Sequence, residues 1–175
     1  TFRVLFAGQV ALGKGVGYLL EAREQLGWRD AELWLAGVLA GDARRALGRL
    51  LAQPGVRLLG YELCPETLYR AADVFCLPSL SEGSALVTYE AMAAGLASVL
   101  TLEAGAVARD GQEALLTSAG DVAALVRALT RLRDDHALRQ RLGRAARLLA
   151  ERFTWARYGE GLVELYGRLL SGLAS

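Results

Sequence analysis

The sequence predicts an α/β fold: a doubly wound parallel sheet of about six strands with helices on both faces. Two observations predict it. Short apolar segments alternate with longer amphipathic segments along the 175 residues, and Asp73–Leu77 is a short, mostly apolar run, as in a strand buried on both faces. The length suits one domain with a substantial core, and the chain has no internal repeat, low-complexity tract or linker. We therefore expect a single domain over residues 1–175, built from β-α-β units with right-handed crossovers.

The predicted strands are the short runs rich in aliphatic and β-branched residues. They lie at Arg3–Ala7, Glu32–Ala36, Val56–Leu59, Val74–Leu77, Ser98–Thr101 and Ala114–Leu116. The predicted helices repeat apolar residues at three- and four-residue spacings. They lie at Lys14–Leu26, Asp42–Ala52, Pro65–Ala71, Ala85–Ala94, Val122–Arg133, His136–Arg152 and Trp155–Leu169. In the strand order 3-2-1-4-5-6, the loops after the first and fourth strands flank the point where the winding reverses, and ligands bind there.

The segment P-S-L-S-E-G-S-A-L-V-T-Y-E-A-M-A-A-G (Pro78–Gly95) places two carboxylates across a predicted strand-to-helix junction. Glu82 lies in the loop at the carboxyl end of a buried strand, and Glu90 lies in the second turn of the helix. Unpaired backbone donors and the helix dipole favour an anion at a helix start. The N–H groups expected there are those of Ser84, Ala85 and Leu86. The segment therefore predicts a site for a ligand with both phosphate and hydroxyl groups.

The loop after the first strand leads to Lys14, the only lysine in a chain with nineteen arginines. A compact ammonium directly after a glycine loop suits phosphate, and the alternative is a solvated surface lysine. The pattern G-x-x-x-x-G-K is complete from Gly8 to Lys14, but Gly15 stands where a P-loop has Ser or Thr to hold Mg²⁺. The pattern G-x-G-x-x-G fails because Tyr18 occupies the last glycine position.

Composition argues against several classes of function. A net charge of +1 gives no general attraction to nucleic acid. No apolar run approaches the roughly 18 residues of a spanning helix, and no signal peptide is visible. Cys64 and Cys76 form no C-x-x-C pair and indicate a reducing, intracellular compartment. The sequence has no D-x-D pair or Cys/His cluster that would predict a metal site. The only methionine is Met92, so we expect a piece of a longer chain.

Taken in order, the motifs resemble the carboxyl-terminal, nucleotide-sugar-binding domain of the retaining glycosyltransferases of family 4 (group 1). Glu82 and Glu90 match the E-x7-E signature of that family. Other matching segments run from end to end: G-Q-V-A-L-G-K-G, L-W-L-A-G, V-R-L-L-G-Y, L-Y-R-A-A-D-V-F-C-L-P-S, A-R-D-G and E-R-F-T-W-A-R-Y. The resemblance implies a Rossmann-like sheet that forms one half of a GT-B architecture. It also implies an amino-terminal acceptor domain in the same full-length chain.

The resemblance implies a role for each matched residue. Glu90 would accept the two ribose hydroxyls of the nucleotide, and the alternative is an ordinary exposed helix glutamate. Glu82 would face the donor sugar near the reacting carbon, and the alternative is a loop carboxylate that accepts N–H groups at the helix start. Lys14 and the helix-start amides would neutralise the diphosphate, so Lys14 and Glu82 are the predicted catalytic residues. The other predicted donor-binding residues are Gly8, Gln9, Tyr61, Glu62, Leu63, Gly83, Ser84, Ala85 and Leu86.

The resemblance implies a retaining, metal-independent glycosyltransferase domain of hexosyl type. It would use a nucleoside-diphosphate sugar such as a UDP-sugar, without cofactor, for glycan biosynthesis in the cytoplasm or at the inner face of the membrane. Nine arginines against four acids over residues 121–158 are typical of a solvated helical face, and a peripheral membrane contact of the full-length enzyme stays open. We expect the isolated domain to be inactive in transfer.

Two alternatives to a catalytic domain remain. One is a non-catalytic nucleotide-sugar-binding or regulatory module. Gln9 favours it, because members of the family often carry arginine at that position. The other is a P-loop nucleotidase, which would require Mg²⁺ for nucleotide binding.

Overall fold

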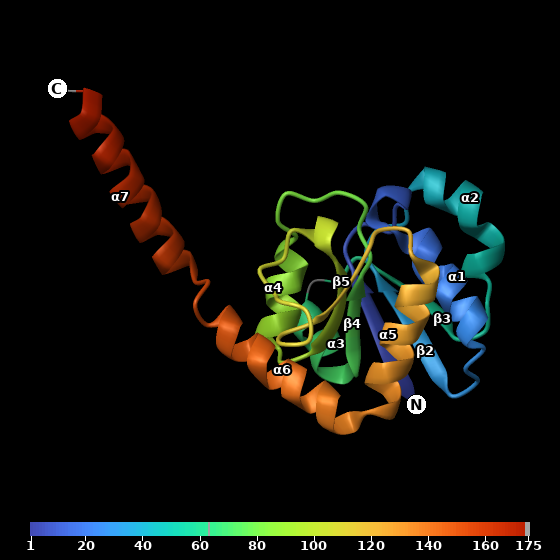
Figure 1. Cartoon of the computed structure of the whole chain (residues 1–175). Helices are drawn as coiled ribbons and strands as arrows, with labels where there is room; N and C mark the ends of the chain where they lie inside the picture. Colours follow the sequence, from blue (N-terminus) through green and yellow to red (C-terminus); the bar gives the residue numbers. More distant parts are fainter. Residues whose placement is uncertain (63, 174–175) are drawn as a thin grey trace.

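The computed structural model describes residues 1–62 and 64–173, arranged around a six-stranded parallel sheet in the order β3-β2-β1-β4-β5-β6. The strands are β1 (Phe2–Ala7), β2 (Ala31–Ala36), β3 (Val56–Gly60), β4 (Val74–Leu77), β5 (Ala97–Thr101) and β6 (Leu115–Thr117). Helices cover both faces of the sheet (Figure 1). The predicted fold class and strand order are confirmed, and each predicted strand end lies within one residue of the observed one.

Two sets of helices flank the sheet. On one face lie α1 (Val16–Leu26), α2 (Gly41–Leu51) and α5 (Val122–Asp134), and on the other lie α3 (Pro65–Ala71), α4 (Leu86–Ala93) and α6 (His136–Ala150). Two short 3-10 turns, η1 (Leu12–Lys14) and η2 (Leu102–Ala104), follow β1 and β5. This assignment corrects the predicted start of the first helix. Lys14 ends η1, Gly15 adopts a left-handed conformation with φ of 70°, and α1 begins only at Val16.

The core lies between these layers and explains why the middle strands form. Every residue of β4 and β5 is buried, as the apolar run Val74–Leu77 predicts for β4. Phe6 and Phe75 are the largest of the fully buried side chains. Cys76 is buried in β4, where desolvation raises the pKa of its thiol, so it behaves as a small apolar residue.

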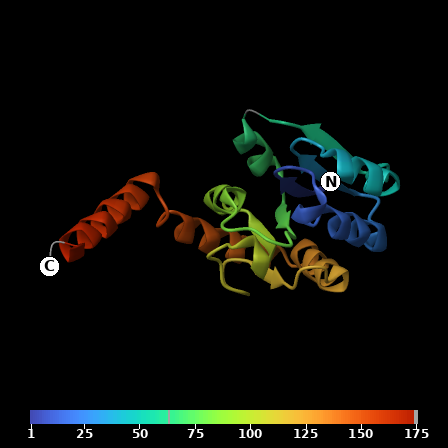
Figure 2. The ribbon, with the colours of Figure 1, turned by 90° about the horizontal axis from the view of Figure 1, so that it is seen from above.

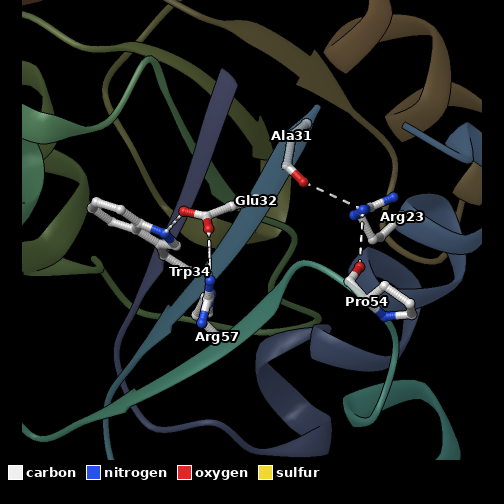
Figure 3. Close-up of polar contacts among 6 residues, drawn as sticks. All are labelled: Arg23, Ala31, Glu32, Trp34, Pro54 and Arg57. Atoms are coloured by element: carbon white, nitrogen blue, oxygen red, sulfur yellow. Dashed lines mark hydrogen bonds and ion pairs between the residues drawn. The ribbon is translucent and has the colours of Figure 1, made fainter. Parts of the chain in front are cut away.

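Polar contacts join strands and helix at the amino-terminal end of the sheet (Figure 3). The guanidinium of Arg23 in α1 donates to the carbonyl oxygens of Ala31 at 3.3 Å and Pro54 at 3.0 Å, at the starts of β2 and β3. Glu32 in β2 accepts from Arg57 in β3 at 3.1 Å. The bonds of Arg23 satisfy backbone carbonyls, and the pair of Glu32 and Arg57 ties the edge strand β3 to its neighbour β2. They lie at the opposite end from the loops that carry the predicted site.

The last helix, α7 (Trp155–Leu173), stands away from the sheet in both views (Figures 1 and 2). Apolar side chains recur on it at three- and four-residue spacings, yet they are exposed: Trp155 is 76% accessible, Tyr166 58% and Leu170 69%. Across residues 1–62 and 64–173, no helix combines the length and apolar character that crossing a membrane requires.

Candidate ligand-binding site

The loops that follow β1 and β4 pack directly against each other. A Cβ atom on Gly15 would lie 1.8 Å from the carbonyl oxygen of Pro78, a distance that no real side chain occupies. The N–H of Leu80 donates to the carbonyl oxygen of Gly13 at 3.0 Å. Glycine is therefore required at position 15, both for its positive φ and for this close backbone approach.

This contact brings the two predicted catalytic residues together although they lie 68 residues apart in the sequence. Lys14 and Glu82 form an ion pair, with 32% of the Lys14 side chain and 14% of the Glu82 side chain accessible. Ser79 Oγ donates to Glu82 Oε1 at 3.0 Å, and the N–H of Glu82 donates to the carbonyl of Glu103 at 2.8 Å. The carboxylate and the ammonium thus lie together in a partly buried position at the carboxyl end of β4.

The alternative role for Glu82, a carboxylate that accepts N–H groups at the helix start, is wrong. Its recorded partners are Lys14 and Ser79, and no side chain caps the amino terminus of α4. Within the described residues, side-chain caps occur instead at Asp121 and Asp135, which accept from the starts of α5 and α6.

The start of α4 differs from the prediction at one amide. Ala85 is the N-cap, and its N–H donates to the carbonyl oxygen of Ala104 at 3.2 Å, so it is not a free donor. The Ala85 amide is paired because of a tertiary contact, since the η2 turn packs against this loop. Among the described residues, no acceptor is recorded for the N–H groups of Ser84 and Leu86, and Gly83 and Ser84 are exposed. Two of the three predicted amides thus remain available at this helix start.

A cavity of about 430 Å³ opens at the carboxyl ends of β1, β2 and β3, a size typical of ligand pockets. Five predicted residues line it: Gly8, Gln9, Tyr61, Glu62 and Glu90. Lys14 and Glu82 are not among its lining residues, but Lys14 lies on the loop that contributes Gly8 and Gln9, and Glu82 lies on the loop that leads into α4, the helix that contributes Glu90. Leu63, the remaining member of the predicted turn, lies outside the described residues.

Glu90 differs from an ordinary exposed helix glutamate. The phenol of Tyr69 in α3 donates to Glu90 Oε2 at 2.8 Å, and Tyr69 is only 3% accessible. Burial is the main cause that raises the pKa of Tyr69, and the hydrogen bond to Glu90 raises it further. The phenol therefore stays protonated and is always a donor.

Three residues of the site were not predicted from the sequence. From the sequence, Tyr69 is interpreted as an apolar position of a helix, although it lies in the matched segment L-Y-R-A-A-D. Ser79 directly follows Pro78 and lies three residues before Glu82. This closeness in the sequence was the only signal for the hydrogen bond between Ser79 and Glu82. Gly37 lets the β2 loop reach the β1 loop, because a Cβ there would lie 1.8 Å from the carbonyl oxygen of Gly8.

The described residues contain no cluster of three or more His, Cys, Asp or Glu side chains arranged to hold a metal ion. The site offers donors in Lys14 and the two amides at the start of α4, and acceptors in Glu82 and Glu90. A cation and free amides attract anionic oxygens, and a carboxylate accepts hydroxyl groups.

Comparison with known proteins identifies relatives of this chain. The family model for glycosyl transferases group 1 matches residues 1–135. The chain is 34% identical to D-inositol 3-phosphate glycosyltransferase of Pseudarthrobacter chlorophenolicus, over 95% of this chain and 42% of that protein. It is 35% identical to the enzyme of the same name from Salinispora arenicola, over 96% of this chain and 41% of that protein. The chain thus spans less than half the length of these curated relatives.

Solved structures share the fold. Sucrose-phosphate synthase from Thermosynechococcus elongatus matches with a TM-score of 0.86 and 25% identity, over 98% of this chain and 46% of that one. Anabaena HepE in complex with UDP-glucose matches with a TM-score of 0.86 and 22% identity, over 96% of this chain and 49% of that one. The matched architecture is one half of a GT-B glycosyltransferase, as predicted. The chain belongs to the family of glycosyl transferases group 1.

Proposed function

We propose that this chain is the donor-binding domain of a retaining, metal-independent glycosyltransferase that takes a UDP-sugar. The observation that carries the proposal is the pairing of a nucleoside-sized cavity around Glu90 with a Lys14–Glu82 pair, in which Lys14 lies on the β1 loop that lines the cavity and Glu82 on the loop that leads into the helix of Glu90. Anabaena HepE, whose fold is the same, has been crystallised with UDP-glucose, which supports the choice of donor.

The proposed binding mode follows the chemistry of each part of the ligand. The base would lie against Tyr61 and Glu62, and Glu90 would accept the ribose hydroxyls. The diphosphate would meet Lys14 and the N–H groups of Ser84 and Leu86. The sugar would then lie beside Glu82, whose carboxylate accepts its hydroxyl groups.

Lys14 and Glu82 neutralise each other in a partly buried position, where an unpaired charge is costly. A diphosphate offers Lys14 more than one negative oxygen, so the ammonium would exchange partners when the donor binds. The Glu82 carboxylate would be released at the same moment for the sugar.

Catalysis would rest on electrostatic stabilisation. As the bond between sugar and phosphate breaks, negative charge grows on the leaving diphosphate and the sugar becomes oxocarbenium-like. Lys14 and the two amides would already be aimed at that diphosphate, which is the arrangement that lowers such barriers most. Glu82 would hold the sugar in orientation beside the developing positive charge.

The activity of the whole protein is part of the proposal. Because the chain spans less than half of its relatives, we propose that an amino-terminal domain of the same full-length chain holds the acceptor. The curated relatives are named for D-inositol 3-phosphate, so this compound is the first acceptor to test. We also propose that the enzyme acts in glycan biosynthesis in the cytoplasm.

A second candidate function rests on Gln9. This neutral, exposed side chain lines the cavity at a position that often carries arginine in the family. A site with one less cation would hold a diphosphate more weakly, as in a regulatory module that senses nucleotide sugars without transfer. The UDP affinity of the Gln9→Arg variant distinguishes two cases. A higher affinity indicates a donor site that was weakened by the missing cation, and an unchanged affinity indicates that the diphosphate does not lie near position 9.

Binding of UDP is expected to be independent of divalent metal. Gly15 stands where a P-loop hydroxyl would hold Mg²⁺, so the phosphates would be neutralised by Lys14 and amides alone. Calorimetric titration with UDP in EDTA should give a dissociation constant within about twofold of that in Mg²⁺. A large loss of affinity on chelation would favour a nucleotidase of the P-loop type instead.

Lys14 and Glu90 are expected to act on different parts of the nucleotide. Lys14→Ala should weaken UDP binding by about 1.5–3 kcal/mol, the range for hydrogen bonds to charged groups, and barely affect uridine. The variant also leaves the Glu82 carboxylate unpaired near the phosphates, which places the loss toward the upper end. Glu90→Ala should weaken both ligands, because they share the ribose.

The matched control for Lys14→Ala is Arg57→Ala, which removes one positive charge at the opposite end of the sheet. This control separates the loss of affinity caused by a missing contact with the phosphates from the loss caused by a lower net charge. Equal losses for uridine and UDP in Lys14→Ala would show that the phosphates lie elsewhere.

A further inference from the structure

We propose that Tyr69 is a positioning residue that fixes the Glu90 carboxylate in the orientation in which it accepts the ribose hydroxyls. The inference rests on the proposed function, and it adds to the site a polar side chain from α3 that the sequence did not predict. Its role is to act through Glu90 without touching the nucleotide.

The geometry around Tyr69 makes it a rigid donor. Its phenol donates to Glu90 Oε2 at 2.8 Å, and only 3% of the residue is accessible. Its ring packs edge-on against Phe75 of β4, with centroids 6.1 Å apart and planes inclined by 60°. A buried ring held by the sheet has little freedom, so the position of its hydroxyl is set by the core.

The bond leaves Glu90 with capacity for a ligand. A carboxylate offers about four lone-pair sites on two oxygens, and Tyr69 occupies one of them. Tyr69 is the only hydrogen-bond partner recorded for the Glu90 side chain among the described residues. The remaining sites match the two hydroxyl groups of a ribose.

A second cavity shows what the tyrosine prevents. This cavity, of about 470 Å³, adjoins the first, and the two share Pro65, Tyr69 and Glu90 in their linings. Besides Glu90, the second cavity carries two arginines, Arg70 and Arg147, against one carboxylate, Glu66. A Glu90 side chain without its phenol partner would be drawn by charge toward these arginines and away from the first cavity. The Tyr69 hydrogen bond therefore keeps the Glu90 carboxylate in the orientation that faces the first cavity rather than the second.

Tyr69→Phe tests the inference because it removes the hydroxyl and keeps the ring that packs on Phe75. By calorimetry, the variant should bind UDP about threefold to tenfold more weakly, the consequence of losing one hydrogen bond. It should bind 2′,3′-dideoxyuridine diphosphate as the unaltered protein does, because that ligand lacks the hydroxyls that Glu90 would accept. In a Glu90→Ala background, Tyr69→Phe should cause no further loss.

Two additional variants sharpen the experiment. Tyr158→Phe removes an exposed phenol from α7 and should leave affinity unchanged. Arg70→Ala, combined with Tyr69→Phe, should recover part of the lost affinity, because it removes one charge that draws Glu90 away. A purely structural role for Tyr69 predicts neither this recovery nor the insensitivity of the dideoxy ligand.

The outcomes separate the two proposals. If the unaltered protein binds no uridine nucleotide, the proposed function is wrong, and this inference with it. If it binds UDP and Tyr69→Phe binds equally well, only the positioning role is overturned. An equal loss for both ligands, or an additive loss in the Glu90→Ala background, would likewise overturn it.

Discussion

The purified 175-residue chain is expected to bind UDP and to transfer no sugar at a measurable rate. Holding an acceptor within reach of the reacting carbon contributes about 7–11 kcal/mol in favourable cases. The chain covers only 41–42% of its curated relatives, so we place the acceptor groups in the part of the enzyme outside it. In the chain alone we expect this cavity to be open to water, which weakens electrostatic contacts with a ligand. Binding should therefore be weak, with a dissociation constant on the order of 10–1000 μM, or about −7 to −4 kcal/mol.

Two measurements check this expectation together. Calorimetry with UDP reports binding, and release of UDP from UDP-glucose in the presence of D-inositol 3-phosphate reports transfer. The control is the full-length enzyme under the same conditions. Robust acceptor-dependent transfer by the chain alone would contradict the division of labour, and an absence of nucleotide binding would contradict the donor site itself.

Gly15→Ala is expected to lower the free energy of unfolding by about 2–6 kcal/mol, the sum of two costs. The backbone there has a φ of 70°, which costs about 1–3 kcal/mol for a residue with a side chain. The added methyl would also lie 1.8 Å from the carbonyl oxygen of Pro78, so the two loops must separate, at a cost comparable to that of overpacking, about 1–3 kcal/mol.

Gly13→Ala is the matched control two residues away. Position 13 has no positive φ, and a Cβ there meets no atom within 4 Å. Urea denaturation should therefore show a change within about 1 kcal/mol for the control. Where Gly15→Ala still folds, it should also lose UDP affinity, because the Lys14 loop no longer meets the Glu82 loop. Equal stability of the two variants would show that the loops tolerate separation.

The fold was predictable because its signals are local. Val74–Leu77 is a run of four apolar residues, and the observed strand has the same ends, since burial on both faces demands that composition. The strand order 3-2-1-4-5-6 is that of a doubly wound sheet, the fold class that the alternation of strands and helices predicts. Pro65–Ala71 was likewise predicted at both ends, where a proline at the first helical position marks the start.

What could not be predicted depends on contacts between distant segments. Lys14 was placed at the start of a helix, but the approach of Pro78 holds Gly15 in a left-handed turn and delays α1 to Val16. The amide of Ala85 was expected to be free, but the carbonyl of Ala104 occupies it. No periodicity within one segment encodes such pairings. The roles of the site residues stay predictions until a ligand is measured.

The exposed face of α7 has a consequence for handling the chain in solution. A 19-residue helix is about 28 Å long, and a row of aromatic and aliphatic side chains along it is a patch of the kind that monomers rarely leave in water. Its polar side adds little net charge, because Arg157 and Arg168 are balanced by Glu160 and Glu164. Nothing there repels a second copy. Solubility and aggregation will therefore depend on concentration through α7, while the sheet that holds the candidate site stays folded behind it.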